Sequence, residues 1–193
     1  MVGKAEKGCY GGGKEAVNKQ LQEEDRREAE ATVDARLLTR KLLLENGFFD
    51  VEIQEDASLI AHTSRGDESV SIDFLISVDG SPLMIVKCSM ALESRERHVI
   101  ALARAAFDIP PPLCAITDGL VTRVYRTASG SMFSELKEDF PSRARLLAEA
   151  AQIKPEPVSK KRREMETMIL MAFEAASCPR VPDRINDGEG SNK

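Results

Sequence analysis

The sequence predicts a mixed α/β domain, and three observations carry that prediction. Apolar residues recur at helical spacing in residues 33–46 and again in residues 88–108. Two apolar runs meet at an Asp-Gly turn within residues 70–87, which is typical of a β-hairpin. A short apolar run, residues 113–117, follows the second helical segment, and a strand–helix–strand unit favours one parallel strand pair.

The remaining elements follow from local patterns. Residues 48–55 alternate between apolar and polar side chains, as in a half-buried strand, and a loop containing His62 leads from them to the hairpin. Gly47 is a natural end for the first helix, and three consecutive prolines, residues 110–112, end the second. Further elements are predicted as a strand at residues 121–125, a helix at residues 141–152 and a last helix from Lys160.

The predicted organisation is one domain with two tails. Residues 1–31 are rich in Gly, Lys and Glu with almost no apolar face, so they are predicted to be a disordered or loosely helical tail. Residues 32–135 form the predicted core and residues 136–178 a C-terminal helical extension. Residues 179–193 are polar and turn-rich, and we expect a second disordered tail there.

Composition excludes several classes of protein. The 193 residues suit one domain, and a hydrophobic content of 42% is enough for a core. A net charge of −5 does not favour nucleic acid for the chain as a whole, although a local basic face can still bind it. No apolar run approaches the roughly 18 residues of a membrane span, and no signal peptide is evident. The four cysteines lack zinc-ligand spacing, and we expect reduced thiols in a cytoplasmic protein without a membrane partner.

The predicted hairpin contains two charges. Asp73 lies within its first strand and Lys87 ends its second, and charged groups are costly to bury unless they are paired or functional. Two interpretations remain open at this point. The residues form an ion pair between neighbouring strands, or they belong to a functional site. His62 and His98 are expected on the surface, and Cys88 is expected to be a buried, inert thiol.

Four segments resemble a known family. They are LLLENGF at residues 42–48, SIDFLI at residues 71–76, DGSPLMIVKCS at residues 79–89 and IPPPLCAITDGLVTRVYRTASG at residues 109–130. In this order they resemble the PD-(D/E)XK nucleases, and more narrowly the N-terminal domain of type I restriction enzyme R subunits. The resemblance implies a restriction-endonuclease-like core, which consists of a helix, a three-strand meander, a helix and a strand.

The resemblance also implies a magnesium site. An acid on the second strand, matched by Asp73, would bind Mg²⁺, and a lysine on the third strand, matched by Lys87, would position the attacking water. The family's second acid lies two residues before that lysine, where this chain has Ile85. Substitute ligands are conceivable, with Glu45 preferred, and the others are Glu52, Glu55 and Glu93.

We therefore expect a domain with an eroded metal site, which binds nucleic acid or a partner chain without efficient cleavage. An active Mg²⁺-dependent DNA endonuclease with a relocated acid is one alternative, and a non-catalytic structural or regulatory module is another. A homo-oligomer stays open. The candidate nucleic-acid-binding residues, which could equally form ordinary solvated faces, are Arg95, Arg97, Arg104, Lys160, Lys161, Arg162 and Arg163.

Overall fold

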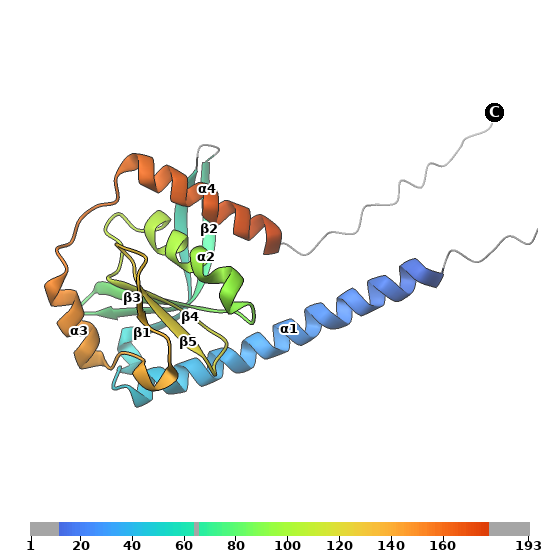
Figure 1. Cartoon of the computed structure of the whole chain (residues 1–193), viewed down its shortest axis with the longest axis horizontal. Helices are drawn as coiled ribbons and strands as arrows, with labels where there is room; N and C mark the ends of the chain where they lie inside the picture. Colours follow the sequence, from blue (N-terminus) through green and yellow to red (C-terminus); the bar gives the residue numbers. More distant parts are fainter. Residues whose placement is uncertain (1–11, 64–65, 178–193) are drawn as a thin grey trace, which may run out of the picture.

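A six-stranded mixed sheet lies between two layers of helices in the computed structural model, which describes residues 12–63 and 66–177 (Figure 1). Helices α1 (Gly12–Glu45) and α3 (Arg143–Gln152) supply core residues to one face of the sheet. Helices α2 (Leu92–Ala105) and α4 (Lys160–Ser177) supply core residues to the other face. The predicted mixed α/β class is confirmed. The predicted tail at residues 179–193 lies outside the described residues.

The strands follow one another across the sheet in chain order. Neighbouring strands are antiparallel except β3 and β4, which are parallel and are connected by α2. The strand–helix–strand prediction is therefore confirmed. The strands are β1 (Ile53–Thr63), β2 (Gly66–Val78), β3 (Ser81–Cys88), β4 (Leu113–Thr117), β5 (Thr122–Arg126) and β6 (Met132–Ser134).

The predicted central hairpin is confirmed as β2–β3. Asp79 and Gly80 connect the strands with φ angles of +50° and +75°. Positive φ at both central residues defines a type I′ turn, whose twist matches that of the paired strands. The turn pairs Val78 with Ser81, and an irregularity between Ile76 and Ser77 then shifts the register by one residue, so that Leu75 pairs with Ile85.

The first strand is longer than predicted. A single 3₁₀ turn (Asp50–Glu52) precedes β1, which then continues to Thr63, so the prediction that His62 lies in a loop is wrong. The buried residues in the second half of β1 are Ala57 and Ala61, and such small side chains give a weak apolar signal. The three-residue strand β6 was not predicted either.

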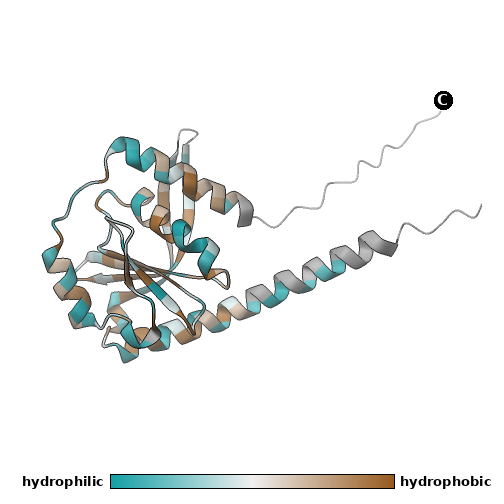
Figure 2. Cartoon of the chain, in the orientation of Figure 1, coloured by the Kyte–Doolittle hydropathy of each residue, from teal (hydrophilic) through white to brown (hydrophobic). Residues whose placement is uncertain are grey.

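Helix α1 begins well before the apolar segment that predicted a helix at residues 33–46. Among the side chains of α1 that the structure describes, the buried ones, Ala35, Thr39, Leu42 and Leu43, all lie in its C-terminal third. The N-terminal part extends away from the sheet, and its described side chains are largely hydrophilic (Figure 2). Ion pairs one turn apart, such as Arg26–Glu30 at 3.4 Å, support such a helix. None of the helices in the described ranges is apolar over enough length to cross a membrane.

Helix α4 is held on α2 by a buried carboxylate. Glu166 is fully buried and accepts hydrogen bonds from Arg97 and from Arg104, the latter at 2.7 Å. Arg104 also donates to the carbonyl of Thr127 at 2.7 Å, which ties both helices to the end of β5. Burial lowers the pKa of the Arg104 guanidinium, and its hydrogen bond to Glu166 opposes this.

His98 belongs to the same helix interface, so its predicted surface position is wrong. It is 2% exposed, it contacts Glu174 at 2.8 Å and its ring stacks on Phe173. The prediction was wrong because charged residues flank His98 in the sequence, and local sequence does not indicate that α4 covers this face of α2.

Replacing Glu166 by Gln should lower the free energy of unfolding by about 3 kcal/mol, because Arg104 then stays buried without a countercharge. Urea denaturation measures the loss. Glu164→Gln is the matched control, since Glu164 lies on the exposed side of the same helix and should change stability by less than about 0.5 kcal/mol. Equal effects of the two substitutions would contradict this role of Glu166.

Candidate functional site

The structure brings Asp73 and Lys87 together. Phe74 pairs with Val86, and this register places Asp73 opposite Lys87 across the hairpin. Lys87 Nζ lies 3.7 Å from Asp73 Oδ2 and donates to the carbonyl of Ser71 at 3.1 Å. The two side chains are mostly buried, with 22% and 12% of their surfaces exposed.

The Asp73 carboxylate has two further partners. Its Oδ2 accepts a 2.7 Å hydrogen bond from the backbone N–H of Cys88, and its Oδ1 lies 3.6 Å from Nε of Arg36 on α1. A buried carboxylate is tolerated when hydrogen bonds and positive charges compensate it. Three groups compensate Asp73: the Cys88 N–H and Lys87 from β3, and Arg36 from α1.

Arg36 joins a second carboxylate to this centre. Its terminal nitrogen Nη2 lies 2.7 Å from Oδ1 of Asp56 on β1. The flanking pairs Glu55–Phe74 and Ala57–Ile72 place Asp56 opposite Asp73 in the sheet. Hydrogen bonding to Arg36 lowers the pKa of Asp56, and the same bond raises the pKa of Arg36.

Sequence reasoning missed both Arg36 and Asp56. Asp56 could have been found only from the register of the full β1–β2 hairpin, and the predicted strand ended at Glu55, one residue before it. Arg36 could not be distinguished in the sequence from the many other charged residues of α1. Asp56 also has a φ of +51°, which is uncommon outside glycine and interrupts the ladder opposite Asp73.

Ile85 lies in the hydrophobic core. It is fully buried and belongs to the cluster beneath α2 that includes Val99 and Cys114. A carboxylate at this position would be removed from water and surrounded by apolar side chains. The position that the resemblance assigns to a second acid is therefore part of the packing between the sheet and α2.

The four substitute acids each pair with a cation elsewhere. Glu45 lies nine residues after Arg36 on α1, which places it about 13 Å further along the helix axis. The contacts are Glu45 with Lys41 at 3.7 Å, Glu52 with Arg143 at 2.6 Å, Glu55 with Arg40 at 2.7 Å and Glu93 with Arg123 at 3.9 Å. Arg143 lowers the pKa of Glu52 through the hydrogen bonds between them.

The residues around Asp73 do not fit a magnesium ion. Mg²⁺ requires oxygen ligands in near-octahedral geometry, and a guanidinium between two carboxylates occupies the place of a shared cation. Asp73 and Asp56 already have Arg36 between them, and the lysine and a backbone N–H hold the remaining oxygen of Asp73. We therefore derive no catalytic step through a metal at this site.

Cys88 lies beside Asp73 and has the buried position expected from the sequence. Its Sγ lies 3.8 Å from the hydroxyl of Thr39. Burial, followed by the charge of Asp73, raises the pKa of the Cys88 thiol to about 12, and burial does the same for Cys114. These thiols are protonated at neutral pH and are poor nucleophiles.

The two thiols should make stability fall at alkaline pH. An unfolded thiol ionises near pH 9.0, whereas the folded ones hold their protons to about pH 12, so the unfolded chain releases protons first in this window. Urea denaturation at about pH 8 and about pH 10 measures the loss of unfolding free energy. The double variant Cys88→Ala and Cys114→Ala should lose less over the same interval, and an unchanged loss would exclude the thiols as its source.

The predicted nucleic-acid-binding residues lie along α2 and α4 in different environments. Arg104 is buried against Glu166, whereas Arg97 and Arg162 are each more than one third exposed. Lys160 and Lys161 are exposed at the start of α4. The remaining contacts are Arg163 with Asp108 at 2.7 Å and the guanidinium of Arg95 over the ring of Phe173.

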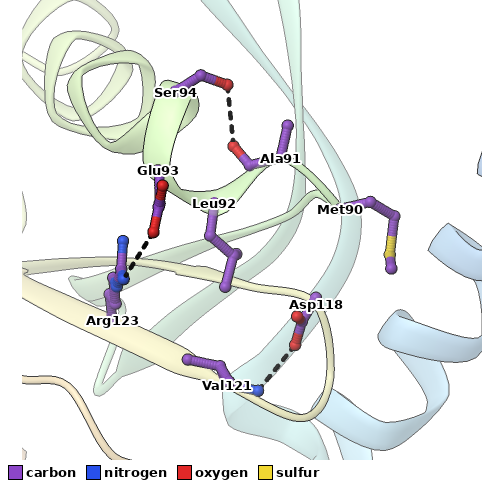
Figure 3. A pocket seen from close by; sticks show the side chains of 8 residues that line it. All are labelled: Met90, Ala91, Leu92, Glu93, Ser94, Asp118, Val121 and Arg123. Atoms are coloured by element: carbon purple, nitrogen blue, oxygen red, sulfur yellow. Dashed lines mark hydrogen bonds and ion pairs between the residues drawn. The ribbon is translucent and has the colours of Figure 1, made fainter.

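A shallow pocket lies apart from Asp73 and Lys87, between the start of α2 and the turn after β4 (Figure 3). Met90, Leu92 and Val121 supply its apolar lining. Its polar side chains have partners within the chain: Asp118 accepts the N–H of Val121 at 2.7 Å, and Arg123 pairs with Glu93 and Glu96 although its Nε is buried without a hydrogen bond.

Comparisons with known proteins give no match: no family model, no curated protein and no solved structure resembles the chain closely enough to be identified. Its function is therefore inferred from its own residues.

Replacing Asp73 by Asn should lower the free energy of unfolding by about 2 kcal/mol, because Lys87 and Arg36 then lose a buried countercharge. Asp56→Asn is the matched control. It removes a carboxylate from the same arginine, but its side chain is 73% exposed, so we expect a loss below about 1 kcal/mol. A larger loss for Asp56→Asn, measured by urea denaturation, would contradict the central role of Asp73.

Proposed function

We propose that the chain is a PD-(D/E)XK-like domain that binds nucleic acid without cleaving it efficiently. The observation that carries the proposal is the arrangement of Asp73, Lys87 and Arg36. The acid and lysine that the family uses for catalysis are neighbours on β2 and β3, and an arginine of the same chain neutralises the acid. A cytoplasmic protein of this kind would act on DNA together with other chains.

The order of elements supports the family. Helix α1, the antiparallel strands β1, β2 and β3, helix α2 and the parallel strand β4 follow one another in the order implied by the resemblance. Asp73 and Lys87 occupy the second and third of these strands. This agreement of order and position is more specific than either residue alone.

The local chemistry supports a domain that does not cleave. A phosphodiester reaction on this fold needs a metal to generate the nucleophile and to stabilise charge on the phosphate. Arg36 supplies positive charge between two carboxylates but cannot lower the pKa of a bound water as a metal does. The buried Ile85 adds no ligand.

A partner chain is the competing ligand for such a domain. Nucleic acid is favoured because exposed cations gather on α2 and α4, among them Lys160, Lys161 and Arg162, in a chain whose net charge is −5. Phosphate contacts by Lys and Arg supply most of the affinity of sequence-independent binding.

Incubation of supercoiled plasmid and single-stranded DNA with the protein and Mg²⁺ or Mn²⁺ tests the proposal. The natural chain should cut no faster than Asp73→Ala, while both bind DNA in a salt-dependent manner by fluorescence anisotropy. The variant is the control for contaminating nuclease.

Two results would overturn the proposal in different ways. Cutting by the natural chain that disappears in Asp73→Ala would establish the active endonuclease with a relocated acid. Absence of DNA binding at about 50 mM salt would leave a partner chain or a structural role as the function.

A further inference from the structure

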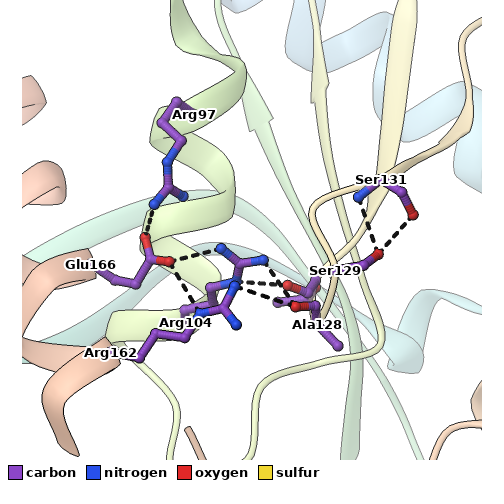
Figure 4. Close-up of polar contacts among 8 residues, drawn as sticks. Arg97, Arg104, Ala128, Ser129, Ser131, Arg162 and Glu166 are labelled. Carbon is purple, nitrogen blue, oxygen red and sulfur yellow. Dashed lines mark hydrogen bonds and ion pairs between the residues drawn. The ribbon is translucent and has the colours of Figure 1, made fainter. Parts of the chain in front are cut away.

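Three arginines share a single buried carboxylate at the interface of α2 and α4 (Figure 4). Glu166 pairs with Arg97 and Arg104, and Arg162 approaches its Oε1 to 3.6 Å from one turn earlier on α4. One carboxylate neutralises one of the three guanidinium groups, so two positive charges remain at this point.

The remaining positive charge is not fully paired by groups of the described chain. One terminal nitrogen of Arg97 is buried and has no hydrogen-bond partner among the described residues. The pKa of Arg104 is lowered first by burial and further by the charges of Arg162 and Arg97, which indicates that the guanidinium groups repel one another.

The start of α4 adds more positive charge. Lys160, Lys161, Arg162 and Arg163 form its first turn, where the helix dipole is itself positive and cations are unfavourable. The cations that reach the surface here are these four and Arg97, beside the carboxylates of Asp108 and Glu164, while Arg104 and Glu166 form a buried pair beneath them. The surface therefore has an excess of about three positive charges in a chain of net charge −5.

A polar turn lies against this surface. The carbonyl of Ala128 accepts from Arg104 at 3.1 Å and from Arg162 at 3.4 Å, which fixes both guanidinium groups beside the turn (Figure 4). Ser129 and Ser131 are exposed and their hydroxyls lie 2.7 Å apart. Hydroxyl donors beside exposed cations are the groups that proteins use for phosphate oxygens.

We propose that this surface, formed by Arg97, Lys160, Lys161, Arg162 and Ser129, is a binding site for phosphate groups, and that it is the place where a nucleic-acid backbone contacts the chain. The second part, contact with a nucleic-acid backbone, rests on the proposed function. Arg104 and Glu166 position the site, because they are buried and hold α2, α4 and the turn together. The partners of Asp73 are Arg36, Lys87 and the Cys88 N–H, none of which belongs to this site, so we expect its affinity to be independent of that carboxylate.

The double variant Arg162→Gln and Lys161→Gln tests the site in the full chain. Binding to a fluorescent duplex of about 20 base pairs should weaken about tenfold, and the slope of log affinity against log salt should fall by about 1 for each cation removed. Arg26→Gln with Lys41→Gln is the matched control, since it removes the same two charges from exposed positions on α1. Circular dichroism and urea denaturation check that both double variants are folded.

Pyrophosphate competition separates the two halves of the inference. Displacement of the duplex by millimolar pyrophosphate, together with weak binding by the α4 variant alone, supports both halves. Pyrophosphate binding by the natural chain without DNA binding, lost in the α4 variant, would support a site for free phosphate and overturn the proposed nucleic-acid function. DNA binding that is unchanged in the α4 variant, or equally weakened in the control, would overturn the site while the proposed function stands. Failure of the natural chain to bind either ligand would overturn the site and its role in the proposed function.

Discussion

The stability of the β2–β3 hairpin depends on partners that compensate the charge of one buried carboxylate, Asp73. Asp73 lies in β2 with little access to water, and its charge would destabilise the sheet without partners. Lys87 and the Cys88 N–H come from β3, and Arg36 comes from α1, so the helix, the meander and the carboxylate depend on one another. A substitution at this point acts on the docking of α1 as well as on the strand pair.

Arginines also pair with a second buried carboxylate, Glu166, but the net local charge there is different. Around Asp73, one arginine is shared by two carboxylates, and the local charge is close to neutral once Lys87 is included. Around Glu166, three arginines share one carboxylate, and positive charge is left at the surface. The first arrangement is electrically balanced within the chain, and the second leaves positive charge that can attract an anion.

Local patterns predicted the elements whose signal is strong. The Asp-Gly turn, the apolar β2 and β3 strands and the proline stop after α2 were all identified, and through them the adjacency of Asp73 and Lys87. Arg36 and Asp56 could not be predicted, because their contact depends on the register of β1 and on which face of α1 meets the sheet. His98 and Glu166 were missed for the same reason: each looks like one more surface charge until α4 is placed over α2.

The central claim is that Arg36, and not a metal ion, supplies the positive charge between Asp56 and Asp73. A crystal structure of the full chain grown in Mn²⁺, with anomalous scattering recorded at the manganese edge, tests it most directly. We expect the Arg36 guanidinium between the two carboxylates and no anomalous peak there. A manganese peak about 2.1 Å from the Asp73 carboxylate, with Arg36 displaced, would contradict it and restore the metal site.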